Sequence, residues 1–236
     1  MAIIHQTTMS PRKLDLLAGW LPAQPWYLGT ARGPALARAG GFRLDDPQGE
    51  VGIEFMVVTD GDGDGAVSYL VPLTYRGTEA PAADASLVGT SEHGVLGRRW
   101  IYDGTGDPVL VEQLVALIQG EAEPQAQSLS NTPDPTVTGI PVTDGSLTVT
   151  GRAAVVASGP PGTDLKIAVA AANGTAGGSL TVRIHRILRP AASAAVTGLA
   201  GQPCLTATWR LHDGTPARGT FATAQYTPPP ATQPSR

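Results

Sequence analysis

Apolar runs separated by glycine-rich and acidic turns occupy most of this chain. In the first half, runs rich in β-branched and aromatic residues predict antiparallel strands over residues 35–44, 50–60, 66–76 and 94–102. In the second half, five further runs predict strands over residues 146–158, 164–174, 179–188, 204–214 and 218–226. The pattern therefore predicts a fold dominated by short strands.

Two segments have the apolar spacing of helices instead. In residues 10–20 a serine–proline pair is typical of a helix start, and apolar residues then recur at helical spacing as far as Trp20. In residues 107–120 an aspartate–proline pair precedes a wide apolar stripe that ends at a glycine. We expect the second helix to bury its stripe against the strands that precede it.

The order of these elements predicts an α+β fold in two parts. Residues 1–120 are expected to form an antiparallel sheet packed against two helices, and residues 136–227 a mostly-β domain. Residues 121–135 contain three prolines and one leucine, too few apolar groups to offset the entropy of ordering, so they are interpreted as a linker. The proline-rich residues 228–236 are expected to be a disordered tail.

Composition and charge narrow the classes of partner. The formal net charge is −4, the chain has only two lysines, and no run of basic residues occurs, so neither nucleic acid nor an anionic membrane is expected as a partner. No signal peptide or run of 18 apolar residues is found, and the single cysteine cannot form an internal disulfide. These features predict a cytoplasmic protein.

Three aspartates form the most metal-like pattern in the sequence. Asp60, Asp62 and Asp64 alternate as in the opening of a calcium-binding EF-hand loop. The twelfth position of that loop is Val71, however, where a glutamate would be needed. Because predicted strands flank the segment, a hairpin turn is favoured over a calcium site.

Three further motifs resemble, in order, the N-terminal cap of actinobacterial maltokinases. They are LPAQPWYLG at residues 21–29, VPLTYRG at residues 71–77 and EHGVLGRRWIYDG at residues 92–104. Maltokinases phosphorylate maltose with ATP in the route from trehalose to glycogen. The resemblance implies a free-standing relative of their cap that works in α-glucan and trehalose metabolism.

Little of the kinase machinery follows the cap-like motifs. The run at residues 180–190 is similar to the maltokinase strand that carries the phosphate-contacting lysine, and it places Arg183 at that position. The sequence has neither a catalytic loop of the type HGDxHxxN nor a DxE metal-binding segment. We therefore expect a non-catalytic module without a cofactor, and keep an ATP-dependent sugar phosphotransferase completed by a partner as an alternative.

Aromatic and basic residues in the cap-like motifs are the candidate contact surface. Each also has a structural interpretation, because aromatic residues of this kind often pack in a core and arginines often form structural ion pairs with carboxylates such as Asp103 or Glu92. The expected partner is an enzyme of α-glucan or trehalose metabolism, and a carbohydrate- or calcium-binding module that contacts glucan is a further alternative. The candidate surface consists of Trp20, Trp26, Tyr27, His93, Arg98, Arg99 and Trp100.

Overall fold

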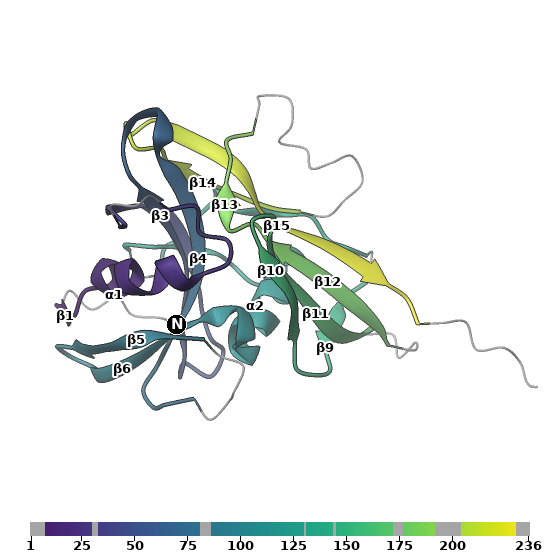
Figure 1. Ribbon diagram of the computed structural model, residues 1–236. Coiled ribbons are helices and arrows are strands. Elements are labelled where there is room, and N and C mark those ends of the chain that lie inside the picture. The colour runs from purple at the N-terminus through teal and green to yellow at the C-terminus, as the bar shows by residue number, and fades with distance from the viewer. Residues whose placement is uncertain are drawn as a thin grey trace, which may run out of the picture.

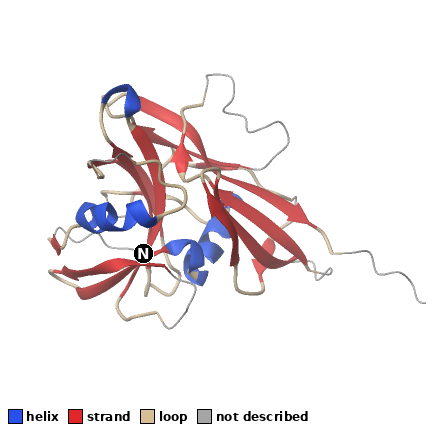
Figure 2. Ribbon diagram, viewed as in Figure 1, coloured by secondary structure: helices blue, strands red, loops and turns tan. Residues whose placement is uncertain are grey.

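The protein is mostly antiparallel β sheet with two short α-helices (Figures 1 and 2). The computed structural model describes residues 8–29, 33–80, 86–129, 131–143, 145–171, 177–191 and 204–229. Most of the predicted tail, from residue 230 onward, lies outside these ranges. Within them, no helix has the length and apolar character needed to cross a membrane.

The helical elements are α1 (Lys13–Trp20), α2 (Pro108–Ile118) and three short 3₁₀ turns, η1 (Leu21–Ala23), η2 (Gly63–Gly65) and η3 (Gly104–Gly106). The strands of the first half are β1 (Met9–Ser10), β2 (Leu36–Leu44), β3 (Gly52–Asp60), β4 (Val67–Arg76), β5 (Ser86–His93) and β6 (Gly97–Asp103). Those that follow α2 are β7 (Gln125–Ala126), β8 (Thr138–Gly139), β9 (Leu147–Val149), β10 (Ala154–Gly159), β11 (Gly162–Ala171), β12 (Gly178–Ile184), β13 (Ile187–Leu188), β14 (Cys204–Arg210) and β15 (Pro216–Thr227).

One hydrogen-bonded sheet connects the two halves of the chain. Its main path runs β1-β5-β6-β4-β3-β2-β14-β15-β12-β11-β10, with all pairs antiparallel. The halves meet in the sheet at one pair between β2 and β14, where Gly40 lies opposite Trp209. A second link forms where β13 pairs with the first residues of β4, which places Ile187 opposite Tyr69.

The central strand β3 is covered on both faces, which explains why its residues are buried without the usual alternation. Ile53, Phe55 and Val57 belong to the larger apolar cluster, which contains α2 and the C-terminal strands. Met56 and Val58 belong to a second cluster on the opposite face, which contains α1 and η1. Figure 1 shows the same arrangement, with the two helices on opposite sides of β3 and β4.

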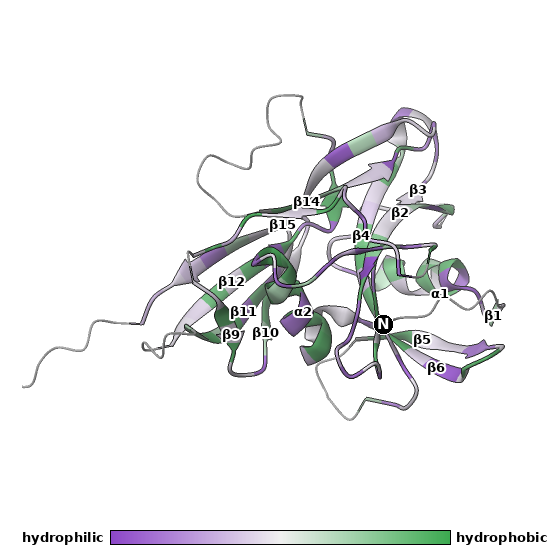
Figure 3. Ribbon diagram, turned by 180° about the vertical axis from the view of Figure 1, so that it is seen from behind, coloured by the Kyte–Doolittle hydropathy of each residue, from purple (hydrophilic) through white to green (hydrophobic). Residues whose placement is uncertain are grey.

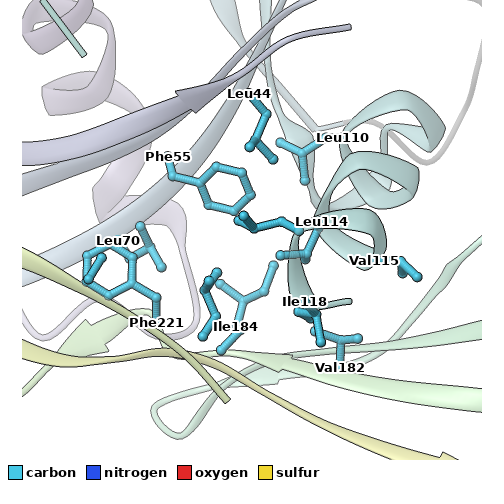
Figure 4. Close-up of a cluster of buried hydrophobic side chains, with 14 of the residues drawn as sticks. Leu44, Phe55, Leu70, Leu110, Leu114, Val115, Ile118, Val182, Ile184 and Phe221 are labelled. Atoms are coloured by element: carbon cyan, nitrogen blue, oxygen red, sulfur yellow. The ribbon is translucent and has the colours of Figure 1, made fainter. Parts of the chain in front are cut away.

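Helix α2 fills the space between the two halves. Its side chains pack on one side against Leu44 and Phe55 and on the other against Val182 and Ile184 (Figure 4). The hydropathy colouring places apolar residues on α2 and on the strands beside it (Figure 3). The cluster joins residues from both sides of the predicted boundary, so the two predicted domains share one core.

Of the two predicted helix starts, the one at Asp107 is confirmed and the one at Ser10 is wrong. Asp107 caps α2 as expected, because its side chain accepts a hydrogen bond from the N–H of Val109. The expected start of the first helix at Ser10 is wrong, since Ser10 pairs in β1 with Glu92. That helix begins at Lys13, and the capping position is Arg12.

The described part of the predicted linker lies on the sheet. Ala126 pairs with Phe42 of β2. Arg38 donates hydrogen bonds to the side chains of Gln127 and Ser128, and the Nε of Arg43 donates to the carbonyl of Ala126. These contacts anchor a segment that composition alone predicted to be unstructured.

We predict that the shared core makes both halves unfold together. Leu114 is fully buried in this core, so Leu114→Ala should lower the free energy of unfolding by about 2–5 kcal/mol. Urea denaturation followed by tryptophan fluorescence and by far-UV circular dichroism should give one coincident transition at a lower midpoint. Leu129→Ala, at an exposed position, is the control and should change stability by less than about 0.5 kcal/mol. Two separated transitions in the wild-type protein would contradict the prediction.

Candidate docking surface

The β5–β6 hairpin brings together four of the residues predicted from sequence. His93 ends β5, and Arg98, Arg99 and Trp100 lie on β6. The ring Nδ1 of His93 accepts hydrogen bonds from the N–H groups of the turn residues Val95 and Leu96, at 3.3 and 3.1 Å. These hydrogen bonds fix the turn at the end of the hairpin.

The tip of the hairpin exposes two apolar side chains. Val95 is 61% exposed and Leu96 is 46% exposed. Leu87 on β5 is exposed as well. Single exposed apolar residues are common on protein surfaces, but neighbours in a fixed turn form a contact point of the kind used at protein interfaces. We call Val95, Leu96, Arg98 and Trp100 the hairpin surface.

The two arginines of β6 differ in their surroundings, as the alternation of a strand predicts. The exposed Arg98 guanidinium lies 5.3 Å from the centre of the Trp100 ring, within the range of a cation–π contact. The Arg99 Nη2 donates to the carbonyl of Leu96 at 2.5 Å. The expected pairing of Arg98 or Arg99 with Asp103 is wrong, because Asp103 pairs with Arg186 instead.

The other aromatic candidates do not join this surface. Trp20 is 9% exposed and Trp26 is 1% exposed, and their ring centres are 5.9 Å apart in the cluster beneath α1. The prediction that these two rings contact a partner is therefore corrected: their faces are covered by the core. Tyr27 is half-buried, and its hydroxyl donates to the Asp60 carboxylate at 2.6 Å.

Asp103 forms a buried ion pair with Arg186, which is 1% exposed. The Nη2 of Arg186 lies 2.5 Å from Asp103 Oδ2, and its Nε donates to the Thr163 hydroxyl at 2.8 Å. The guanidinium lies 4.8 Å from the centre of the Trp26 ring. The main-chain carbonyl of Arg186 accepts a hydrogen bond from the N–H of Leu70. One residue from the second half of the chain therefore binds several elements of the first.

A second ion pair secures the start of α2. Arg76 donates two hydrogen bonds to Asp107, at 2.8 and 2.7 Å, while Asp107 also caps the helix. Between the two ion pairs lies Gly104, where a Cβ atom would come within 2.3 Å of Leu110. The corner before α2 thus holds both ion pairs, and residues of all three sequence motifs take part in them: Trp26 and Asp103 contact Arg186, and Arg76 contacts Asp107.

This corner and the hairpin lie in a segment with a recognisable family pattern. Residues 20–107 match the family model of the maltokinase N-terminal cap domain. The resemblance predicted from the three motifs is confirmed for this segment. The match ends at the capping residue of α2, so the helix and the C-terminal strands lie outside it. No curated protein matches the chain.

Within the cap segment, the three aspartates of the EF-hand-like pattern lie at the hairpin turn between β3 and β4. Asp60 is buried, and its carboxylate accepts hydrogen bonds from the Tyr27 hydroxyl and the N–H of Ala35. Asp62 and Asp64 are exposed in the turn between β3 and β4. Across the described ranges, no three His, Cys, Asp or Glu residues come together as a metal-binding group. The geometry agrees with the turn interpretation.

The predicted phosphate-contacting position lies outside the cap segment. Arg183 on β12 donates two hydrogen bonds, at 2.6 and 2.8 Å, to Asp164, its neighbour in register on β11. The tract between β10 and β11 closes a tight hairpin in which Gly159 lies opposite Gly162. Arg183 is thus engaged in a cross-strand ion pair.

Sequence reasoning missed the residues that most define these sites. Arg186 lies between the apolar ends of β12 and β13, and Glu54 lies in the buried strand β3; a charged residue close to apolar ones was the available signal. Val95 and Leu96 were assigned to a strand, whereas they form the turn. Their exposure depends on where the hairpin ends, which the sequence pattern leaves open by a few residues.

Removal of Arg186 should strongly destabilise the protein. Arg186→Met leaves the buried Asp103 carboxylate without its counterion, so the free energy of unfolding should fall by about 3–5 kcal/mol. Arg183→Met is the matched control, since it breaks a partly exposed pair and should cost at most about 1 kcal/mol. Denaturation midpoints of both variants provide the comparison, and equal losses would refute the special role of Arg186.

Acid should destabilise the protein through His185. Burial lowers the pKa of His185 below its ordinary 6.5, the Arg183 charge lowers it further, and the Asp164 carboxylate opposes them. The Nε2 atom of the ring is enclosed without a described hydrogen-bond partner. The unfolded chain therefore binds the proton more readily, so this contribution is complete above pH 6.5 and declines as the pH falls below it.

The measurement is the free energy of unfolding at pH 7.5 and 5.5 for the wild-type protein and for His185→Gln. The variant should lose less stability over this interval, because it lacks the titrating ring. A loss as large as that of the wild-type protein would assign the acid sensitivity to other groups.

Proposed function

We propose that this protein is a non-catalytic docking module of maltokinase-type α-glucan and trehalose metabolism. The observation that carries the proposal is the match of residues 20–107 to the maltokinase cap domain. Under this proposal the module acts by contact with another protein, and the chain contributes no catalytic group to its partner.

The packing of the C-terminal half supports a contact at the hairpin. One face of β2 and β3 is already covered within the same chain by α2 and by strands β11, β12 and β15. The other face of β3 is covered by α1 and η1. A partner therefore has to meet the cap segment elsewhere, and the hairpin surface projects from the body of the molecule (Figure 1).

The chemistry of the hairpin surface also suits a protein partner. Arginine and tryptophan are enriched in the residues that dominate binding energy, and apolar neighbours exclude water around them. Arg98 and Trp100 form such a pair beside Val95 and Leu96. We propose that the surface binds an enzyme of α-glucan or trehalose metabolism, with maltokinase as the first candidate.

The proposal predicts that purified maltokinase binds the immobilised protein. The double variant Val95→Asp/Leu96→Asp should weaken binding at least about tenfold, which corresponds to about 1.4 kcal/mol. The matched control is Val155→Asp/Val156→Asp, which changes two equally exposed apolar residues on β10 and should leave binding unchanged.

Three outcomes would count against the proposal. Absence of binding to maltokinase and to trehalose-processing enzymes would remove the docking role. Equal weakening of binding by both double variants would show that the partner does not bind at the hairpin surface. Turnover of ATP with maltose by the purified protein alone would remove the non-catalytic role.

A further inference from the structure

A pocket of about 430 Å³ lies beside the first turn of α1, between this helix and the faces of β2 and β3. It is separate from the hairpin surface and from the Arg186 ion pair. Its polar lining consists of Arg12, Lys13, Asp15, Arg38 and Glu54. A volume of this size falls in the range of small-molecule sites.

Glu54 is a fixed and neutralised group in the wall of this pocket. It is 4% exposed, and its Oε2 lies 2.6 Å from the Lys13 ammonium and also accepts the Tyr75 hydroxyl. Gln127 donates to the other oxygen at 2.6 Å. Because these donors occupy both oxygens, Glu54 supports the position of Lys13 and leaves little acceptor capacity for a ligand.

The remaining charges give the pocket one more cation than it has carboxylates. Arg12 is paired with Asp15, with 3.1 Å between Nε and Oδ2. Arg38 makes its hydrogen bonds to neutral acceptors, the Gln127 amide oxygen at 3.0 Å and the Ser128 hydroxyl at 3.1 Å. Among the described residues, no ion pair to a carboxylate neutralises Arg38, so a single negative charge would complete the site.

The rest of the lining is apolar. Leu14 from α1, Leu36 from β2 and Met56 from β3 contribute to the pocket. An ion without an apolar part would leave the partly exposed Leu14 and Leu36 in contact with water, whereas a short hydrocarbon chain would cover them. The lining therefore matches a molecule with one anionic end and one apolar end.

We propose that this pocket binds a small organic carboxylate, with the carboxylate at Arg38 and the hydrocarbon part against Leu14 and Leu36. Arginine suits this role because its planar guanidinium can donate two parallel hydrogen bonds to a carboxylate. Binding would also fix the first turn of α1 against β2. The site is independent of the proposed docking role.

The test is isothermal titration of the full chain with three probes, hexanoate, hexanol and acetate. Hexanoate should bind at least about tenfold more tightly than either of the others, since only hexanoate supplies both the charge and the apolar chain. Arg38→Gln should weaken hexanoate binding at least about tenfold, while Arg183→Gln, which removes an arginine from the distant β12, should leave it unchanged.

A methyl NMR titration provides a readout that does not depend on the variants. Hexanoate should shift the methyl signals of Leu14 and Leu36, and the signals of Leu165 in the C-terminal half should stay in place. Equal affinity for hexanoate and hexanol, binding insensitive to Arg38→Gln, or shifts confined to other residues would each overturn the proposal. No detectable binding of hexanoate would overturn it as well.

Discussion

The buried guanidinium of Arg186 is the interaction on which the arrangement of the two halves depends. A charge of this kind is stable away from water only when a counterion and hydrogen-bond acceptors surround it. Asp103, Thr105 and Thr163 supply these groups, and the Trp26 ring covers the guanidinium. The first two come from the corner before α2 and the third from β11, so these contacts to the guanidinium form only when both halves are in place.

The shared apolar core around α2 also joins the two halves, and it covers part of the cap segment. A helix between two sets of strands buries both of its sides, and neither set can be removed without exposing the other. The C-terminal strands therefore occupy one face of the cap segment within the same chain. Under the proposed docking role, what is left for a protein partner is the edge of the molecule, where the hairpin surface lies.

Local patterns predicted several elements of the fold, but they missed β5 and predicted one strand over residues 146–158, where the structure has β9 and β10. The runs of β-branched residues marked β2, β3 and β4 within two residues of their ends, and the aspartate–proline pair marked the start of α2. The candidate site was predicted only in part: His93, Arg98, Arg99 and Trp100 share the hairpin, whereas Trp20 and Trp26 are in the core. An aromatic residue has the same sequence signature in a core as at an interface, so its neighbours in space decide between the two.

The sequence by itself determined the strand-rich character, the helix start at Asp107 and the relation of residues 20–107 to the maltokinase cap. These depend on residue type and on spacing along a few turns or strands, which are local properties. Only the tertiary structure decided that the proline-rich segment lies on the sheet and that Arg186 pairs with Asp103. Both depend on contacts between residues about 80 positions apart, which burial and charge compensation select and which no local pattern records.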